Sequence, residues 1–463
     1  MLCKEGFQGE IVCTFATADL CNIMLRDSAH IQEFEAEWRN RKARRSGGEL
    51  YEPLYTMEHA QLAIELLHPC DYEQKITLCD GIEVQFTDVG HLLGSSAIEI
   101  WLNEDGVSKK IVFSGDVGNL NQPIINDPRF VEEADYLVIE STYGNRFHAD
   151  RADPISNLAR VIQQTLDRGG NLVIPAFAVG RTQEMLYAIR EIKQKGMLRG
   201  HDSFPVYVDS PMAVEATGIF LQCDISCLDE ETAAMVREGI NPIWFDGVCL
   251  SASAEESRQI NFDNRPKVIL SASGMCEAGR IRHHLKHNLW SENNTVLFVG
   301  YQAEGSLGRR LQNGVKSVKL FGEEIAVNAH IETLQGTSGH ADQAGLLRWL
   351  EGFREKPGQV FVNHGDDDAC TAFRDLLQEK GYHADAPFSG SVYDLLTGKM
   401  TVYTEGTPIH REKKGSARAN AVYGELLAAA EALLAFVKTC KGRANKENAK
   451  FASQIRTLLE KWK

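Results

Sequence analysis

Strand-like apolar runs alternate with helical patterns along almost all of this 463-residue chain, and that alternation is typical of α/β layering. Several runs end on a His, an Asp or a Glu, or place one beside small residues. Five such residues follow one another in the chain: His91, Asp116, Glu140, His340 and His364. Since α/β folds carry functional groups in the loops after their strands, these five residues are candidates for one common site.

The local patterns also predict individual elements. Two hairpins are expected, at 76–86 and 98–113, because each pair of runs flanks an Asp-Gly turn. A long helix is expected from about Ala18 to Arg39, with Asp19 as its cap. The other main expectations are strands over 10–15, 136–140, 171–177, 205–209 and 359–363, and helices over 59–67, 181–194 and 343–353.

The order of these elements predicts the domain organisation. From about Asp153 the pattern is that of an independent parallel α/β domain, and near Val318 the chain returns to the first domain. The last fifty or so residues are rich in alanine and leucine and predict a helical hairpin, broken near Lys441, for packing or dimerisation. The expected regions are 1–150, 151–317, 318–408 and 409–463.

Charge and composition exclude some classes of protein. Hydrophobic residues make up 43% and charged residues 24%, which is ordinary for a globular protein. The net charge of −15 opposes a protein that coats nucleic acid through a basic face. It does not exclude an enzyme whose cleft holds a few arginines and metal ions against phosphate.

Cysteine usage indicates the compartment. The 11 cysteines are scattered and form no CxxC pair, so reduced thiols and a cytoplasmic protein are expected. No apolar stretch is long enough to cross a bilayer, and the first residues lack the pattern of a secretory signal.

The five candidate residues are of the types that metal-assisted hydrolysis of a phosphodiester needs. Two divalent ions about 3.5–4 Å apart activate water and neutralise charge on the phosphoryl oxygens. Imidazole and carboxylate groups are natural zinc ligands. A single His at a strand end is more often a hydrogen-bonded structural residue, so the prediction depends on the combination.

Over nearly all of the chain from Phe7 to about Tyr403, the sequence resembles the β-CASP branch of the metallo-β-lactamase fold, whose members are RNA- and DNA-processing nucleases. The resemblance implies an αββα metallo-β-lactamase sandwich, N-terminally incomplete, with an inserted parallel α/β β-CASP domain at 151–317. The segments that carry it are Gly90 to Ser96, Ser114 to Asp116, Glu140 to Arg146, Ala176 to Glu184, Ser273 to Arg280, Gly305 to Arg309, Ser338 to Asp342 and Asn363 to Gly365.

Carried over by position, the resemblance implies a role for each of the five residues. His91 would bind one zinc ion, His364 a second, and Asp116 would bridge both. Glu140 would orient a histidine, and His340 would face the scissile phosphate as a proton donor. The implied reaction is zinc-dependent hydrolysis of RNA, with the RNA passing between the two domains.

Glycine-rich segments and two arginines suggest where RNA phosphates would bind. Backbone N–H groups in such segments suit oxyanions, and arginines pair with phosphate. The alternative is that the arginines pin one domain to the other through Asp or Glu. Three histidines at 283, 284 and 287 share a helix and are better explained by packing and exposure. The phosphate-binding candidates are Ser273, Gly274, Arg280, Arg309 and Ser338.

One family motif has no counterpart here. No His-x-His-x-Asp-His cluster occurs in the sequence, so His91, Asp116 and His364 are the remaining metal ligands. A catalytic zinc normally has three protein ligands, whereas each ion would have about two, so partial occupancy and little turnover are expected. The missing strands would also leave an uncovered sheet edge, and an incomplete gene model is the first explanation, ahead of a pseudo-nuclease.

Two other functions stay open. One is a catalytically inactive RNA-binding or scaffold protein. The full set of site residues counts against it, because a scaffold has no physical use for them. The other is a hydrolase of the same fold acting on a small molecule, against which the inserted domain weighs. A homodimer through the C-terminal helices is a further expectation.

Overall fold

The computed structural model describes residues 1–46, 49–148, 153–336, 338–407, 414–442 and 445–461. They form two compact units, Met1–Tyr403 and Thr404–Lys463. The domain boundaries expected at 150/151 and 408/409 lie outside the described residues. Within the first unit, two sheets with their helices make two lobes that are joined in one compact body.

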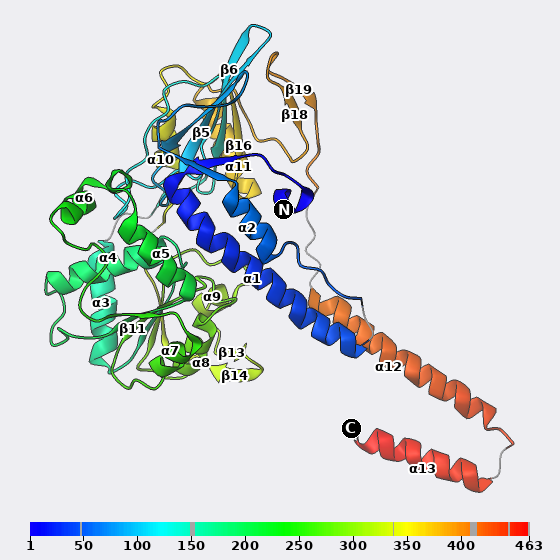
Figure 1. Ribbon diagram of the computed structural model, residues 1–463. Helices are drawn as coiled ribbons and strands as arrows, with labels where there is room; N and C mark the ends of the chain where they lie inside the picture. Colours follow the sequence, from blue (N-terminus) through cyan, green and yellow to red (C-terminus); the bar gives the residue numbers. More distant parts are fainter. Residues whose placement is uncertain (47–48, 149–152, 337, 408–413, 443–444, 462–463) are drawn as a thin grey trace. The chain divides into compact units, whose positions relative to one another are not determined.

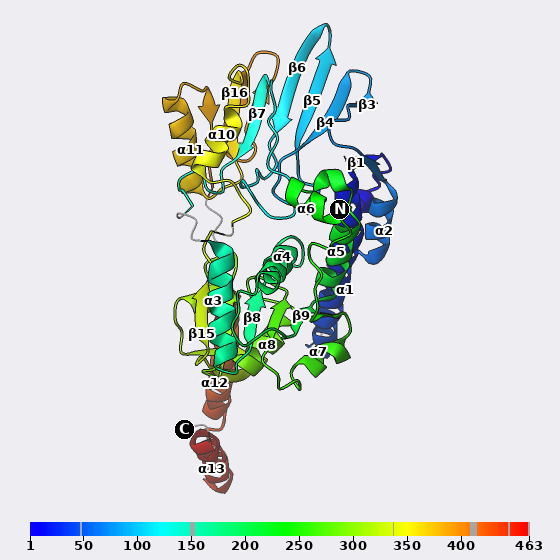
Figure 2. The same cartoon turned by 90° about the vertical axis from the view of Figure 1, so that its left-hand side faces the viewer.

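The first lobe is built on a seven-stranded mixed sheet, and both predicted hairpins are part of it. Four strands are mutually parallel in the order β17, β16, β7 and β6, and the next three pair antiparallel. Figure 2 shows this sheet with α10 and α11 on one side. In sheet order the strands are β17 (Ala384–Asp385), β16 (Gln359–Asn363), β7 (Tyr136–Glu140), β6 (Val107–Phe113), β5 (Ser96–Glu104), β4 (Ile82–Asp88) and β3 (Ile76–Cys79).

The second lobe is built on a six-stranded sheet whose strands are all parallel. This confirms the predicted βαβ pattern. In sheet order the strands are β10 (Val248–Ser251), β9 (Val206–Asp209), β11 (Val268–Ser271), β8 (Leu172–Pro175), β12 (Thr295–Phe298) and β15 (His330–Thr333).

The last strand of this sheet lies beyond the expected boundary at residue 317. The sequence pattern predicts that residues from 318 onward belong to the returning segment, yet β15 pairs with β12 in the inserted sheet. The hairpin β13 (Ser317–Leu320) and β14 (Glu323–Ala326) also packs on that lobe, with Val318 and Leu320 buried in its core. Strand pairing and core packing, which a local pattern does not contain, decide this membership.

Helices cover both faces of the parallel sheet. Leu172 and Ile174 on β8 face one core and Val173 faces the other, which explains the continuous apolar run of that strand. The helices of this lobe are α3 (Pro154–Asp167), α4 (Arg181–Gln194), α5 (Pro211–Gln222), α6 (Glu230–Arg237), α7 (Ala254–Ile260), α8 (Ile281–Asn288) and α9 (Leu307–Gln312), with the 3-10 turn η2 (Ile225–Cys227).

The first lobe has a separate core. Leu137 and Ile139 of β7 and Val360 of β16 pack against α10 (Gln343–Leu350) and α11 (Asp367–Glu379), where Trp349 and Phe373 are buried. The short hairpin β18 (Val392–Asp394) and β19 (Lys399–Val402) contacts the other face through Tyr393, whose ring lies 4.5 Å from that of Phe361.

The N-terminal segment links the two lobes. Helix α1 (Phe15–Ser46) places Ala16 and Leu20 in the core of the inserted lobe, and Figure 1 shows it running beside α5. The predicted cap at Asp19 is wrong, because the helix starts earlier and Thr14 Oγ1 accepts the N–H of Thr17. The segment also contains η1 (Leu2–Glu5), α2 (Met57–Glu65) and the parallel pair β1 (Ile11–Thr14) and β2 (Leu67–Cys70).

The pair β1 and β2 lies against the apolar face of the large sheet near its β3 edge. Val84 and Phe86 of β4 are buried there with Cys70. Farther along the same face, Phe113 remains 38% exposed. This face of the sheet is therefore only partly covered by the described residues.

The second unit contains the predicted helix pair. Helices α12 (Lys414–Thr439) and α13 (Asn445–Lys461) contact each other through Phe436 and Phe451, whose ring centroids are 5.7 Å apart. Among the described residues, no helix has both the length and the apolar character required to span a bilayer.

Candidate metal centre and active site

The structure brings the candidate residues to one edge of the seven-stranded sheet. Strands β6, β7 and β16 are parallel to one another, and β4 has the same direction because it is separated from β6 by the antiparallel β5. Their carboxyl ends therefore meet at the same edge. His91 follows β4, Asp116 follows β6, Glu140 ends β7 and His364 follows β16.

Backbone hydrogen bonds hold three loops together at this edge. The loop after Asp116 lies between the loop of His91 and the loop of His340. Main-chain bonds run to both sides: Gly118 N to Val89 O at 2.7 Å, Asn119 N to Gly339 O at 2.9 Å, and Ala341 N to Val117 O at 2.8 Å. Side chains from distant parts of the sequence are thus fixed by local main-chain pairing.

Glycine makes this close approach possible. A Cβ at Gly118 would lie 2.2 Å from the carbonyl oxygen of Gly90. Gly90 itself has a φ of +62°, which L side chains rarely adopt. The glycines beside His91 and Asp116 are therefore required by the packing of the loops that carry the site.

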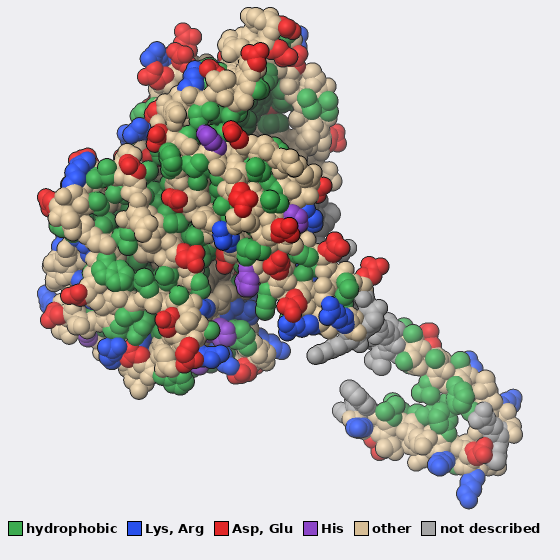
Figure 3. All heavy atoms as spheres, in the orientation of Figure 1, with side chains coloured by type: hydrophobic (Ala, Val, Ile, Leu, Met, Phe, Trp, Pro, Cys, Tyr) green, Lys and Arg blue, Asp and Glu red, His purple; other side chains and the backbone are tan. Residues whose placement is uncertain are grey.

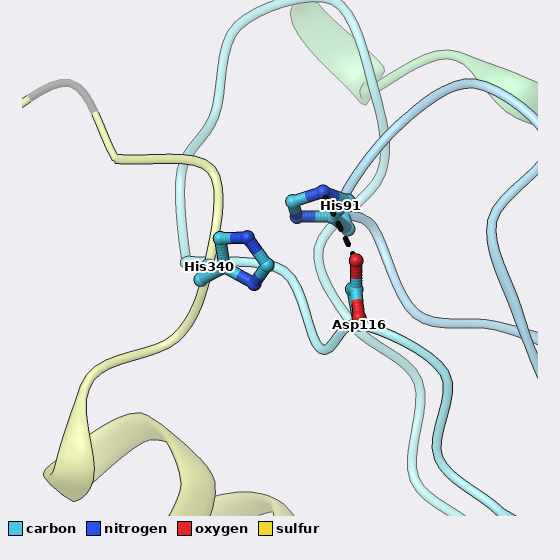
Figure 4. A group of neighbouring side chains, drawn as sticks. All are labelled: His91, Asp116 and His340. Carbon is cyan, nitrogen blue, oxygen red and sulfur yellow. Dashed lines mark ion pairs between the residues drawn. The ribbon is translucent and has the colours of Figure 1, made fainter. Parts of the chain in front are cut away.

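Asp116 contacts both of the other expected metal ligands, through different oxygens. Its Oδ2 lies 3.8 Å from Nε2 of His91, and its Oδ1 lies 3.2 Å from Nε2 of His364. Asp116 therefore lies within reach of both histidines, each through a different oxygen. Figure 4 shows the pair formed by His91 and Asp116, with the ring of His340 beside it.

His91 is in an environment that favours its neutral form. Burial lowers the pKa of its imidazole, and the neighbouring His340 lowers it further, against the opposing effect of Asp116. Its Nδ1 is buried without a hydrogen-bond partner among the described residues. A neutral imidazole close to a carboxylate is a suitable zinc ligand, so the residues present fit a metal ion.

Glu140 and His340 form the second part of the site. Oε2 of Glu140 lies 3.1 Å from Nδ1 of His340, and its Oε1 also accepts the N–H of Val117. Burial acts to lower the pKa of His340, but the hydrogen bond and charge of Glu140, together with Asp116, raise it above its usual value. The carboxylate thus fixes the ring and favours its protonated form.

The tightest group of possible ligand atoms differs from the expected one. Within the part of the chain that the structure describes, His91, Asp116 and His340 have ligand atoms within 4.8 Å of one another. The rings of His91 and His340 are 4.3 Å apart, whereas His364 is 60% exposed in its side chain. His340 therefore lies as close to the candidate metal position as the expected ligands do.

Arg280 is bound inside the inserted lobe. Its guanidinium donates to Oδ1 of Asp209 at 2.8 Å and to the carbonyl oxygens of Ser251 and Ala252. Asp209 also accepts from His284 at 2.6 Å, and both of these side chains are fully buried. Arg280 therefore pairs with an acid, but within the inserted lobe, so these contacts do not pin the two domains together as the alternative expects. They also agree with a packing role for the helix that carries His284.

Arg309 is the more accessible arginine. Its side chain is 30% exposed and lies 3.2 Å from Glu304 without hydrogen-bond geometry. Its guanidinium carbon is 5.7 Å from the ring centroid of Tyr301. Arg309 therefore has one acidic neighbour, whereas Arg280 is held by Asp209 and two carbonyl groups.

The expected anion-binding backbone groups are partly occupied. Ser306 caps α9 by accepting the N–H of Arg309, and the N–H of Leu307 donates to Glu277. Ser273 bonds with Ala278 through its hydroxyl. Gly274 lies under Phe177, since a Cβ there would be 3.3 Å from the ring. The role of these groups toward phosphate stays a prediction.

Sequence reasoning missed several residues that position His340. Gln122 donates to the carbonyl of Ser338 at 2.7 Å, next to His340. His148 lies with Nε2 2.9 Å from the His340 carbonyl, and its N–H donates to Asp342. A single His or Gln outside a strand end gives no local signal, and the contact exists only in the fold.

A cavity of about 680 Å³ lies between the loop at 120–127 and helices α3, α4 and α6. More acidic side chains than basic ones line this cavity, and the basic ones are Arg181 and Lys195. The cavity is therefore poorly suited to phosphate. Charged side chains of both signs are interspersed on the face seen in Figure 3. This face therefore offers no broad basic surface to RNA. The acidic residues that line the cavity are Asp127, Glu184, Glu191, Asp229, Glu230 and Glu231.

An edge that gathers imidazoles and carboxylates beside a second α/β lobe is the type of site that metal-dependent hydrolases use. A model of the Beta-Casp domain matches residues 182–311, and a model of the Zn-dependent metallo-hydrolase RNA specificity domain matches residues 324–387. The chain belongs to the β-CASP family of metallo-β-lactamase-fold ribonucleases.

Similar proteins support this membership. The chain is 33% identical over 382 residues to Ribonuclease TTHA0252 of Thermus thermophilus, covering 82% of this chain and 80% of that protein. It is 31% identical over 360 residues to the RNase J-like protein of Methanocaldococcus jannaschii, covering 77% and 76%. It is 32% identical over 395 residues to the transcription termination factor FttA of Methanosarcina mazei, covering 82% of this chain but 58% of that protein.

Proposed function

We propose that this chain hydrolyses RNA phosphodiester bonds at the edge where Asp116 and His340 meet. The observation that carries the proposal is the pairing of His340 with the buried Glu140, close to a carboxylate that contacts two further histidines. A histidine held by a carboxylate is a competent proton donor to an alkoxide leaving group. Similarity to a protein named as a ribonuclease supports RNA as the substrate.

Zinc is the proposed cofactor. The donor set of His91, Asp116 and His364 fits it, and the matched RNA specificity domain is described as belonging to Zn-dependent metallo-hydrolases. When bound, zinc activates water and neutralises charge on the phosphoryl oxygens. Asp116 would hold the two halves of the site together, because each of its oxygens faces a different histidine.

His340 would act on the leaving oxygen. With Nδ1 directed at Glu140, its Nε2 is the nitrogen left to carry a proton. Glu140 would keep the ring in that orientation and stabilise its positive charge. Glu140 is therefore a positioning residue, whereas His340 is the proposed proton donor.

We also propose that this 463-residue polypeptide binds zinc weakly and turns over slowly. The sequence contains no His-x-His-x-Asp-His cluster, so three ligands would have to serve two ions. Zinc content well below two equivalents is the expected result of metal analysis on the purified protein. Two equivalents of zinc with rapid cleavage would contradict this part of the proposal.

The central test compares three proteins under zinc-supplemented conditions. The wild type is expected to cleave a labelled RNA, and Asp116→Asn is expected to lose both zinc and cleavage. His340→Gln is expected to keep the zinc content of the wild type but to lose cleavage by about 100-fold or more. Cleavage by His340→Gln at the wild-type rate would overturn the assigned role. If the wild type and both variants bind RNA and none of them cleaves it, the inactive RNA-binding alternative is favoured.

Self-association through α12 and α13 is a further proposal. Leu434 and Leu458 on these helices are 57% and 54% exposed, which leaves apolar surface that a second copy could cover. Sedimentation of the intact chain would test it. A monomer at all concentrations would contradict it, and replacement of both leucines by Glu should abolish any dimer that is seen.

A further inference from the structure

Two aromatic rings lie exposed at one edge of the inserted sheet. Phe177 is 48% exposed and Tyr301 is 50% exposed. Phe177 follows β8 and Tyr301 follows β12, and these two strands are parallel neighbours with Leu172 opposite Thr295. Both rings therefore belong to the carboxyl edge of the sheet, where parallel α/β folds bind ligands.

The packing around Phe177 keeps its ring at this edge. Gly274 follows β11, the neighbour of β8 on its other side. A Cβ at this glycine would lie 3.3 Å from the Cδ2 and Cε2 atoms of Phe177. The missing side chain at 274 thus leaves the room that the ring of Phe177 occupies.

The same edge faces the candidate active site. Gly180, also in the segment after β8, comes so close to Leu92 that an added Cβ would lie 2.5 Å from its Cδ1. Leu92 is the neighbour of His91 in the chain. In addition, β15 pairs with β12 and its carboxyl end leads directly into the segment that carries His340. The rings and the proposed catalytic groups therefore belong to facing edges of the two lobes.

A positive charge accompanies one of the rings. The guanidinium carbon of Arg309 is 5.7 Å from the ring centroid of Tyr301. Its acidic neighbour Glu304 is 81% exposed, so that pair is weakened by solvent. An aromatic ring with an arginine beside it offers a surface for a base and a cation for the adjoining phosphate.

We propose that Phe177 and Tyr301 form a stacking platform for bases of single-stranded RNA, and that Arg309 pairs with the backbone next to it. The inference rests on the proposed function in taking RNA as the substrate, and it assigns the contact with unpaired bases to these two rings. Bases within a duplex are stacked on one another and cannot lie on a protein ring. Stacking is tolerant of sequence because every base has a π-face.

The experiment measures RNA binding by the full chain in EDTA, which removes divalent ions and keeps the RNA intact. The probe is a single-stranded oligoribonucleotide that contains 2-aminopurine, whose fluorescence falls when it stacks. Phe177→Leu and Tyr301→Leu retain apolar bulk but lose the ring. Each is expected to weaken binding by about tenfold and to reduce the fluorescence change.

Two control variants separate stacking from other effects. Tyr301→Phe keeps the ring and is expected to bind as the wild type does. Phe262 is 75% exposed and precedes β11, at the opposite end of that strand, so Phe262→Leu is expected to have no effect. The duplex of the same sequence is expected to bind about tenfold or more weakly than the single strand.

The outcomes distinguish this inference from the proposed function. If Phe177→Leu and Tyr301→Leu bind the RNA and quench its fluorescence as the wild type does, the platform is overturned. Cleavage by the wild type would still support hydrolysis in that case. Equal binding of duplex and single strand, or no RNA binding by the wild type, would also overturn it. Ring-dependent binding without cleavage would support the platform and count against hydrolysis.

Discussion

Glu140 holds His340 through a hydrogen bond of 3.1 Å between its Oε2 and the Nδ1 of the ring, and the carboxylate is only 1% exposed. Because a buried carboxylate interacts strongly with a nearby cation, this contact favours the protonated imidazole. The second oxygen accepts the N–H of Val117, which follows Asp116 in the chain. One acid therefore connects the proposed proton donor with the loop of the proposed bridging ligand.

The first prediction concerns that acid. Glu140→Gln keeps the size of the side chain but removes its charge, so cleavage of RNA should fall by about 100-fold or more while zinc content is retained. Single-turnover rates and metal analysis would measure both. Glu99 is a buried acid of the same sheet, paired with Lys110 at 2.6 Å, and Glu99→Gln serves as the control. An equal loss of rate in both variants would contradict a specific role for Glu140.

The second prediction concerns the glycine between the loops. In Gly118→Ala the new methyl group would lie 2.2 Å from the backbone oxygen of Gly90. Backbone atoms at that distance would have to shift, and such a shift is energetically unfavourable. The free energy of unfolding should fall by about 1–3 kcal/mol, and zinc should be lost. Gly218 in α5 has open space around it, so Gly218→Ala should stabilise by up to about 1 kcal/mol. Urea unfolding curves that show equal effects would refute the steric argument.

The third prediction separates the two arginines. Arg280→Ala should lower stability, because it removes hydrogen bonds to Asp209 and two carbonyl groups in the inserted lobe. Arg309→Ala should leave stability within about 0.5 kcal/mol and weaken RNA binding instead. Titrations at several salt concentrations should give a shallower salt dependence for Arg309→Ala by about one charge. The roles assigned to the two arginines would be reversed if folded Arg280→Ala bound RNA more weakly while Arg309→Ala kept the salt dependence of the wild type.

The fourth prediction is a pH dependence of stability. The pKa of Asp209 is lowered to about 2: burial opposes this, but hydrogen bonds from His284 and Ser257 outweigh it. Since the unfolded value is about 3.9, the stabilisation is complete above that value and is lost as the pH falls through about 2.

Asp209→Asn should therefore lower the free energy of unfolding by about 3–5 kcal/mol at pH 7, because it leaves Arg280 and His284 without their acidic partner. At pH 3 the difference in the free energy of unfolding between this variant and the wild type should be smaller by about 1 kcal/mol. Urea unfolding at pH 7 and pH 3 would measure it. A difference that is constant between the two pH values would show that the carboxylate does not carry the effect.

Local patterns predicted most of the elements. The Asp-Gly turn at Asp105 was predicted because this pair tolerates positive φ, and Asp105 and Gly106 have φ values of +48° and +81°. Helix α4 has the predicted bounds. The start of α1 was misjudged, because its cap Thr14 is also the last residue of a strand and gives no separate signal.

The sequence by itself determined which residues can serve as ligands and proton donors, and that they stand at the ends of strands, because residue type and strand periodicity are local properties. Only the tertiary structure decided which atoms meet: that Asp116 faces two histidines, that His340 lies beside His91, and that Arg280 is held by Asp209. It also decided that β15 joins the inserted sheet. Such contacts join residues far apart in the chain, and they are set by strand pairing and core packing that no short segment encodes.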